Sequence, residues 1–198
     1  MDPRLLYIPP TRLVALDSRQ ALDRVRYGAG PTPFGDAVLV WCEQGIVALW
    51  LATRDAGAAL SFVQKRHEVN AGMSGGSDLL VDGWGRDDAN AAQRLAEMFD
   101  ACAASRQTIP VLVRASPFEL QVWTALCDIP SGKTLTYTEL AHSIGRPEAV
   151  RAVGSAVGRN GVAWLIPCHR VIPKSGGVGQ FRWGSELKQK LLRWEAGR

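Results

Sequence analysis

Hydrophobic and polar positions change character about halfway along the chain, and the first half opens on a hairpin pattern. Two apolar runs, 37–42 and 46–51, flank Glu43-Gln44-Gly45, whose composition is typical of a tight turn. Apolar runs of this length, bounded by turn residues, favour strands over helices. The pattern therefore predicts two antiparallel strands joined by that turn.

Helical spacing follows the predicted hairpin. Residues 58–66 and 89–104 predict helices, the second because Leu95, Met98 and Phe99 recur at the spacing of one buried face. The other segments are assigned by composition: a strand at 111–113, a loop at 70–85, and an N-terminal tail at 1–23 that is partly helical near 17–23.

Two capping boxes mark helix starts in the second half of the chain. Ser116 and Glu119 form one, with Pro117 at the first helical position, and predict a helix that ends near Asp128. Thr136 and Glu139 form another, and the short helix that they open is expected to end at Gly145.

Two further helices are predicted after Gly145. One runs from Pro147 to Arg159, with Ala149, Val150, Val153 and Val157 towards the core, and the other covers 185–194. Two short helices joined by a tight glycine-containing turn are typical of a helix-turn-helix. The second half is therefore expected to be mainly helical.

The outward face of the helix at 147–159 carries Arg151, Ser155 and Arg159, spaced by four residues among small side chains. Most recognition helices present long polar side chains to the wide major groove. A slim helix instead favours close approach to a narrow groove, where base identity is poorly distinguished. The alternative is that the small residues serve helix packing and the arginines are solvated. The net charge of +4 permits an acidic partner without requiring one.

Composition limits the class of protein. The 198 residues suffice for one domain or two small ones, and 46% hydrophobic with 21% charged residues is ordinary for a globular protein. The cysteines are scattered without a C-x-x-C pair, so no zinc site, redox dithiol or disulfide framework is indicated: Cys42, Cys102, Cys127 and Cys168. Without a stretch of ~20 apolar residues or a secretory leader, we expect a cytoplasmic protein that does not associate with membranes.

Residues 164–166 predict a buried strand, and Cys168 and His169 follow it after a single proline. Most free cysteines are small buried hydrophobes, and neighbours on a strand point to opposite faces, so adjacency alone does not make a catalytic pair. A reacting thiol needs a base to take its proton and a third group to orient that base. Tyr137, Asn160 and Glu195 each also have a structural interpretation, as a packing residue, a cap and a solvated charge at a helix end.

The segment Pro167-Cys168-His169-Arg170-Val171 resembles the active-site signature of the 6-O-methylguanine-DNA methyltransferases, also called methylated-DNA–protein-cysteine methyltransferases. The similarity covers residues 111–198 strongly and 24–110 weakly. Its other elements are Ile129 to Thr134, Thr136-Tyr137, Arg151 to Gly154, Asn160, Gly179, Arg182 to Gly184, and Glu195.

The resemblance implies that Cys168 attacks the alkyl carbon on the 6-oxygen of guanine and keeps the alkyl group as a thioether. His169, through a water, would help to remove the thiol proton, and Glu195 would orient His169. Asn160 would hold the turn that places the active-site segment. Tyr137 would promote rotation of the nucleotide out of the duplex and hydrogen-bond the base. Each protein molecule would repair one lesion and stop.

The resemblance also implies residues that bind DNA and enclose the base. Arg151 would fill the gap that the flipped base leaves. The implied DNA-binding residues are Tyr137, Arg151, Ser155 and Arg159, and those of the base pocket are Tyr137, Val157, Val171 and Arg182. The partner would be double-stranded DNA with 6-O-alkylguanine, contacted from the minor groove with low sequence specificity by a monomer. The reaction requires no metal and no organic cofactor.

The implied fold is α+β. A small N-terminal α/β domain of the ribonuclease H-like kind at 24–110 would follow an extension at 1–23. A mainly helical, winged helix-turn-helix-like domain at 111–198 would carry the reaction. Gly161 follows Asn160 where many members of the family have proline, so the hinge is expected to be looser. Phe181 stands where many have tyrosine, which keeps a pocket wall without its hydroxyl.

Two other functions compete with alkyl transfer. A protein that binds alkylated DNA as a sensor would have no use for both Cys168 and Glu195. A Cys-His hydrolase would leave Arg151, Tyr137 and the helix-turn-helix unexplained. The sequence therefore favours a single-turnover DNA alkyltransferase.

Overall fold

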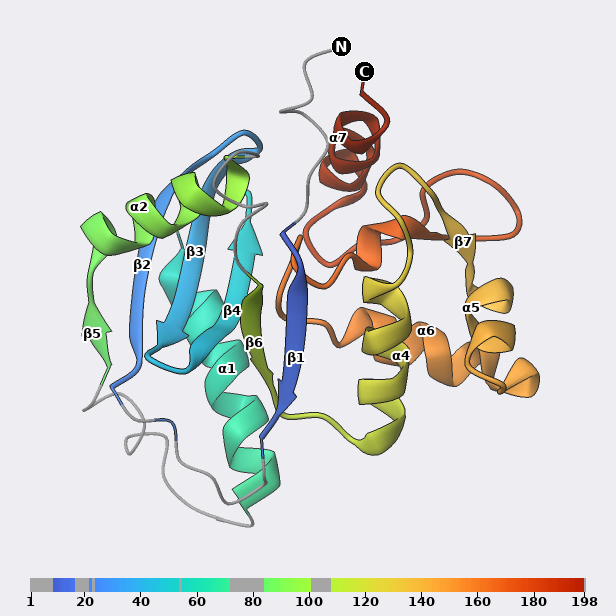
Figure 1. The fold of residues 1–198 in the computed structure, drawn as a ribbon, viewed down its shortest axis with the longest axis horizontal. Helices are drawn as coiled ribbons and strands as arrows, with labels where there is room; N and C mark the ends of the chain where they lie inside the picture. Colours follow the sequence, from blue (N-terminus) through green and yellow to red (C-terminus); the bar gives the residue numbers. More distant parts are fainter. Residues whose placement is uncertain are drawn as a thin grey trace.

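The computed structural model describes residues 9–16, 22, 24–53, 55–71, 84–100 and 108–197. Most of the loop expected at 70–85, most of the segment expected to be partly helical near 17–23, and Cys102 lie outside these ranges. Figure 1 shows a sheet with two helices on one side of the molecule and a group of shorter helices on the other.

A six-stranded mixed sheet forms the first part of the molecule, in the order β1-β6-β4-β3-β2-β5. Its strands are β1 (Thr11–Ala15), β2 (Arg26–Thr32), β3 (Gly35–Cys42), β4 (Gly45–Leu51), β5 (Gly85–Arg86) and β6 (Ile109–Val113). The predicted hairpin is confirmed as β3 and β4, which pair antiparallel with Leu39 opposite Leu49. The predicted strand at 111–113 is confirmed as β6.

Strand β1 corrects the prediction of a tail at the N-terminal end. Thr11–Ala15 pairs parallel with β6, with Leu13 opposite Val111, and forms one edge of the sheet. The sequence did not predict this strand because five residues after two prolines carry little periodicity. The partner that stabilises it comes almost a hundred residues later in the chain.

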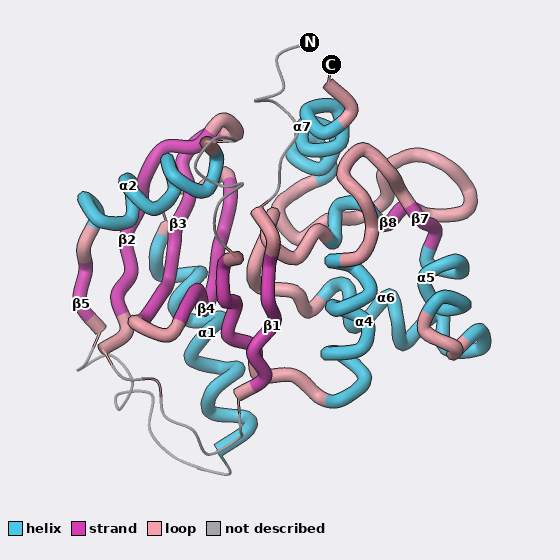
Figure 2. Tube along the Cα trace, in the orientation of Figure 1, coloured by secondary structure: helices cyan, strands magenta, loops and turns pink. Residues whose placement is uncertain are grey.

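Helices α1 (Ala56–Ala71) and α2 (Asp88–Phe99) pack on the sheet (Figure 2). Alternate residues of β3 belong to different hydrophobic clusters: Val40 packs with Val63 of α1, and Leu39 with Leu95 of α2. Because both faces of the sheet are covered, β3 and β4 are apolar without alternation. Helix α2 ends earlier than the predicted residue 104, since Asp100 is its C-cap.

The second part of the molecule is mainly helical. Its elements are α4 (Pro117–Cys127), β7 (Leu135–Thr136), α5 (Tyr137–Ser143), η2 (Pro147–Ala149), α6 (Val150–Gly158), η3 (Cys168–Arg170), β8 (Val171–Ile172) and α7 (Ser185–Glu195). Both predicted capping boxes are present, at the start of α4 and of α5. The helix predicted from Pro147 begins as a 3-10 turn, and only Val150–Gly158 is α-helical. No helix in the described ranges is long and apolar enough to span a membrane.

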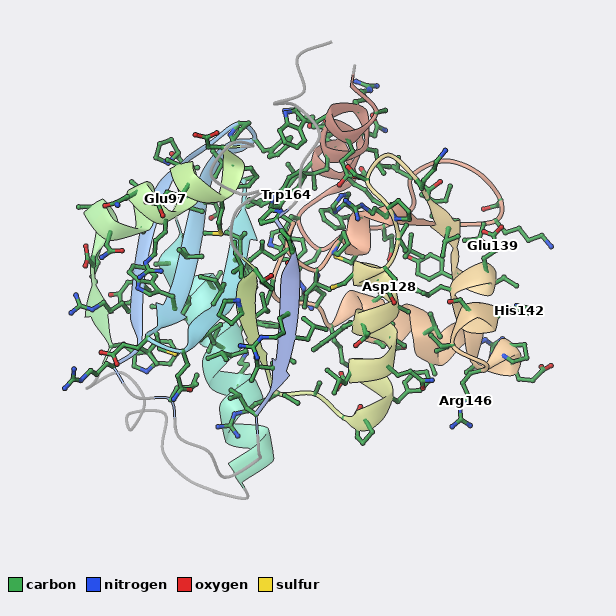
Figure 3. The ribbon with its side chains drawn as sticks, in the orientation of Figure 1. Glu97, Asp128, Glu139, His142, Arg146 and Trp164 are labelled. Carbon is green, nitrogen blue, oxygen red and sulfur yellow. The ribbon has the colours of Figure 1, made fainter. Side chains whose placement is uncertain are left out.

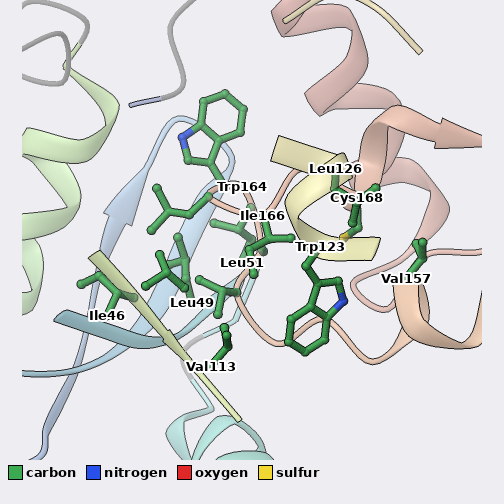
Figure 4. Packing of buried hydrophobic residues seen from close by; sticks show 14 of the residues in the cluster. Ile46, Leu49, Leu51, Val113, Trp123, Leu126, Val157, Trp164, Ile166 and Cys168 are labelled. Carbon is green, nitrogen blue, oxygen red and sulfur yellow. The ribbon is translucent and has the colours of Figure 1, made fainter. Parts of the chain in front are cut away.

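One hydrophobic core joins the sheet to these helices. Figure 4 shows Leu49 and Leu51 of β4 near Ile166, with Trp123 and Leu126 of α4 on the other side. Trp123 also donates from Nε1 to the carbonyl of Ala156 at 2.9 Å, which fixes α4 against α6. The helices are therefore held both to the sheet and to one another.

The segment 164–166 is not the strand that its apolar sequence predicts. Val162 forms a single parallel bridge with Leu49, and the chain then turns, with the amide of Ile166 donating to the carbonyl of Val162 at 3.1 Å. Trp164 has a φ of 69°, which is unusual for a bulky residue. Its side chain lies between the sheet and the C-terminal helices (Figure 3). Hydrophobicity indicated burial here, but a short apolar run cannot distinguish a strand from a buried turn.

Candidate active site

Asn160 holds together the two ends of the turn that leads to Cys168. The side chain is 1% exposed. Its Nδ2 donates to the carbonyl of Ile166 at 2.9 Å and lies 3.0 Å from Sγ of Cys168, while its Oδ1 accepts from the amide of Val162 at 2.8 Å. A buried amide with these partners fixes the path of the chain from residue 160 to residue 168.

Strand β4 fixes the same turn from the side of the sheet. The amide of Leu49 donates to the carbonyl of Gly161 at 3.1 Å, and the amide of Ala163 donates to the carbonyl of Leu49 at 2.9 Å. The segment after Asn160 thus runs beside β4 for a few residues and forms backbone hydrogen bonds with it. The N-terminal sheet therefore takes part in placing the cysteine.

Cys168 begins a 3-10 turn and is 4% exposed. Burial raises the pKa of the thiol to about 11, against the hydrogen bond from Asn160 and the positive charges of Lys188 and Arg182. At neutral pH the resting thiol is therefore protonated. A nucleophilic role requires a base that removes this proton during the reaction.

His169 is buried against Glu195 at the C-terminal end of α7. Its Nε2 lies 2.8 Å from Oε1 of Glu195, and both side chains are fully enclosed. Burial lowers the pKa of His169, despite the opposing effect of Glu195, so the imidazole is neutral at pH 7. Because the carboxylate accepts from Nε2, the lone pair lies on Nδ1, which has no hydrogen-bond partner among the described residues.

Glu195 is a buried ion-pair partner, which excludes its interpretation as a solvated charge at a helix end. Arg170 donates to the carboxylate from Nε and from Nη2, each at 2.9 Å, and the amide of Gly132 donates at 3.2 Å. Burial alone would raise the pKa of Glu195, but His169 and Arg170 lower it to about 2. The carboxylate is therefore ionised and held in one orientation.

Trp164 covers the ring of His169. The two rings are parallel within 8°, with centroids 5.9 Å apart. Trp164 in turn contacts Phe34, Phe99 and Trp194, which come from the β2–β3 turn, α2 and α7. The imidazole is thus enclosed by aromatic side chains from both parts of the molecule, and this desolvation keeps it neutral.

Lys188 is a buried cation near the thiol that sequence reasoning missed. It is 1% exposed, and its Nζ donates to the carbonyl of Val171 at 2.6 Å. Burial lowers the pKa of Lys188, against the opposing effect of Cys168. A signal was present, since Lys188, Leu191 and Glu195 share one helical face at spacings of three and four.

A cleft of about 420 Å³ lies above Cys168. It brings together six residues that the sequence singled out: Tyr137, Val157, Asn160, Cys168, Phe181 and Arg182. Gln180 and Trp183 also line it. Val171 does not line the cleft, although its carbonyl binds Lys188 nearby. Burial, and then the proximity of Cys168, raise the pKa of Tyr137, so its hydroxyl keeps its proton.

The outer face of α6 lies beside this cleft. Arg151 and Ser155 are exposed, and the hydroxyl of Ser155 donates to the carbonyl of Arg151 at 3.1 Å. Arg159 is exposed as well, and forms an ion pair of 3.3 Å with Glu119. The small residue Gly154 of the same helix lines the cleft. Within the described ranges, no cluster of three or more His, Cys, Asp and Glu side chains could hold a metal ion.

Known proteins resemble the chain most closely over the part that carries this site. A family model described as 6-O-methylguanine DNA methyltransferase, DNA binding domain, matches residues 117–197. The methylated-DNA–protein-cysteine methyltransferase of Salmonella typhimurium is 35% identical over 170 residues, which cover 83% of this chain and 91% of that protein.

The chain belongs to the methylated-DNA–protein-cysteine methyltransferase family. The O6-methylguanine methyltransferase of Mycobacterium tuberculosis has a similar structure, with a TM-score of 0.63 and 28% identity over 88% of this chain and 94% of that one. A structure of the M. tuberculosis OGT in complex with DNA matches with a TM-score of 0.63 and 27% identity, covering 87% of this chain and 93% of that one.

Several curated relatives are much longer than the matched region. The chain spans 25%, 46% and 49% of the length of three of them. The part common to this methyltransferase family and to the matched structures includes the sheet as well as the helices. The matched structures therefore share the mixed α/β fold of this chain, and not its helical part alone.

Proposed function

We propose that the protein is a single-turnover DNA repair methyltransferase that transfers an alkyl group from 6-O-alkylguanine to its own Cys168. The observation that carries this proposal is the network of buried hydrogen bonds around the thiol. Asn160 fixes Cys168 under the cleft, and a neutral His169, oriented by an ionised Glu195, is its immediate neighbour in the chain. These are the parts that an activated cysteine nucleophile needs.

The reaction would begin with removal of the thiol proton. The Nδ1 lone pair of His169 would accept it through one water, and Glu195 would stabilise the imidazolium that forms. Lys188 and Arg182 would stabilise the thiolate by their charge, as they already oppose the effect of burial on the pKa of Cys168. This proton transfer requires a neutral His169, because a protonated imidazole has no lone pair that could accept the proton.

The thiolate would then attack the alkyl carbon. A bond forms between Sγ and that carbon, the bond from carbon to the 6-oxygen breaks, and its electron pair leaves with the guanine. Tyr137, whose hydroxyl keeps its proton in the cleft, would donate a hydrogen bond to the developing guanine anion, which then takes up a proton from water. A thioether has no easy hydrolytic exit, so each molecule would react once.

The lesion must leave the base stack before it can reach Cys168. Extrusion of a nucleotide costs a few kcal/mol, and less where damage has weakened the pairing. We propose that α6 enters the minor groove, that Arg151 fills the vacated place in the stack, and that Tyr137, Ser155 and Arg159 contact the backbone. The base would lie in the cleft against Val157 and the backbone near Arg182, both of which line it. The carbonyl of Val171, the third contact that the resemblance implies, accepts from Lys188 and does not line the cleft, so it would reach the base only after a local rearrangement.

We also propose the finer description of the fold. The sheet with α1 and α2 would correspond to a ribonuclease H-like domain at 24–110 after an extension at 1–23, and residues 111–198 to a winged helix-turn-helix-like domain. Strand β6 lies across the proposed boundary, and β1 lies within the extension, so both pieces contribute to one sheet. The scattered cysteines support a cytoplasmic protein, which we propose acts as a monomer.

The first experiment measures the mass of the intact protein after incubation with duplex DNA that contains one 6-O-methylguanine. The expected result is the addition of one methyl group, which peptide mapping places on Cys168, with no further turnover. An unchanged mass together with tight, lesion-selective binding would replace this proposal with a sensor of alkylated DNA.

A further inference from the structure

Phe62 of α1 lies at the junction of the two segments that shape the cleft. The first is the hinge that begins at Asn160 and Gly161. The second is the loop at 179–184, which contributes four residues to the cleft wall: Gln180, Phe181, Arg182 and Trp183. Phe62 belongs to neither segment and comes from the N-terminal part of the molecule.

The hinge approaches the ring of Phe62 so closely that any side chain at Gly161 would have to displace the ring or the hinge. A Cβ atom on Gly161 would lie 2.1 Å from Cε1 of Phe62 and 2.8 Å from its Cζ. Gly161 does not have a positive φ, so its backbone conformation would accept alanine. The requirement for glycine therefore comes from the ring and not from the backbone.

The loop contacts the same ring through Arg182. The guanidinium of Arg182 lies over Phe62, 4.8 Å from the ring centroid, and 5.9 Å from that of Trp50. Arg182 also donates from Nη2 to the carbonyl of Gly158 at 2.6 Å, which ties the loop to the end of α6. Trp50 contacts both Phe62 and Trp183, with centroids 5.7 Å and 6.1 Å apart.

We propose that Phe62 is a positioning residue for alkyl transfer, because its ring holds the Gly161 hinge and the Arg182 loop in the arrangement that places Cys168 beneath the base. The inference rests on the proposed function of the site. A glycine hinge lacks the restriction on φ that proline would impose, and the ring restrains it from outside. Misplacement of reacting groups by ~1 Å costs about 100-fold in rate, so a small shift of the hinge is measurable.

The test compares Phe62→Leu with the unaltered protein in single-turnover reactions on methylated duplex. We expect the rate constant at saturating DNA to fall about 10-fold, because leucine keeps an apolar side chain but loses the flat face under Arg182. Leu95→Val is the matched control. It removes buried volume from α2, on the opposite face of the sheet, and should lower the unfolding temperature without changing the rate constant.

A second pair of variants tests the interlock directly. Gly161→Ala should slow transfer about 10-fold or more, since its Cβ must displace the ring or the hinge. Gly161→Ala is also combined with Phe62→Ala, and the loss of rate in the double variant should be smaller than the product of the losses in the two single variants, because the alanine then has room. Circular dichroism and thermal unfolding establish that each variant is folded when its rate is measured.

The outcomes separate the positioning role from its alternatives. If Phe62→Leu lowers only the unfolding temperature, and the rate constant stays at the unaltered value, Phe62 has a structural role alone and the inference is wrong. Losses for Gly161→Ala and Phe62→Ala that simply multiply in the double variant would also overturn it, since the two residues would then act independently. Failure of the unaltered protein to gain a methyl group would overturn the proposed function itself. The mass of the unaltered protein is therefore measured before any variant is compared.

Discussion

The surroundings of Cys168 and the outer face of α6 lie close together, but the first region is buried and the second is exposed to water. Electrostatic interactions are therefore screened differently in the two regions. His169 and Glu195 are 0% and 2% exposed, so the charge of the Glu195 carboxylate acts on its neighbours without screening by water. Arg151, Ser155 and Arg159 are exposed, so the contacts with a phosphate backbone that we propose for them would be weakened by salt. The comparison teaches that the chemical step and DNA binding can be altered separately.

The sharpest division between the two regions comes from Cys168→Ala. We expect this variant to lose alkyl transfer completely, because no other group occupies the position of Sγ, and to bind methylated duplex with little change. Intact-protein mass and a fluorescence anisotropy titration measure the two properties. Cys127→Ala is the control, since Cys127 lies on α4 outside the cleft, and it should gain one methyl group as the unaltered protein does. Transfer by Cys168→Ala would refute the proposed mechanism.

A second test removes the charge of Glu195. Glu195→Gln should slow transfer about 100-fold, because His169 loses the carboxylate that fixes its tautomer and stabilises its charged form. It should also destabilise the protein by about 3 kcal/mol, since Arg170 would keep a buried charge with one partner fewer. Single-turnover rates and urea unfolding measure these effects. An unchanged rate in the folded variant would exclude Glu195 from proton transfer.

The depressed pKa of Glu195 predicts how acid acts on the fold. The pKa is lowered from 4.5 to about 2, so ionised Glu195 stabilises the native state above pH 4.5, and this contribution is lost as the pH falls towards 2. Other carboxyl groups titrate in the same range, so the informative quantity is the difference between the unaltered protein and Glu195→Gln. Unfolding free energies at several pH values should show that this difference shrinks between pH 4.5 and 2. A constant difference would contradict the ion pair.

The smallest expected effect concerns the exposed face. Arg151→Ala should slow the reaction with methylated duplex about 10-fold, since the flipped base would leave an unfilled gap, and should leave the reaction with the free base 6-O-methylguanine nearly unchanged. Arg94→Ala on α2 is the control for loss of one exposed arginine. Duplex binding should weaken with added salt, whereas the rate with the free base should not. Equal losses on both substrates would exclude Arg151 from base extrusion.

Local signals predicted the helices well. The boxes at Ser116–Glu119 and Thr136–Glu139 work within four residues, so the starts of α4 and α5 followed from the sequence. The hairpin of β3 and β4 is local in the same sense. Strand β1, in contrast, depends on a partner nearly a hundred residues away, and the turn at 164–166 depends on hydrogen bonds with β4. Neither has a local signature.

The candidate site was only partly visible in the sequence. The motif around Cys168 and the resemblance that it carries indicated Asn160, His169 and Glu195, but not that Glu195 is buried between His169 and Arg170. Lys188 was not among the residues that the sequence indicated, although it shares one helical face with Leu191 and Glu195. The contacts of Trp164 and Phe62 with the site could not be predicted from the sequence, because they join the N-terminal part of the molecule to the C-terminal part.

The sequence by itself determined the type of most elements, the family resemblance and the choice of Cys168 as the candidate nucleophile, because short-range patterns and a compact motif encode them. Tertiary structure alone decided the protonation states and the geometry. Burial raises the pKa of Cys168, keeps His169 neutral, and leaves Glu195 ionised only because Arg170 and His169 surround it. Burial and long-range contacts of this kind depend on residues from distant parts of the chain, so they exist only in the folded molecule.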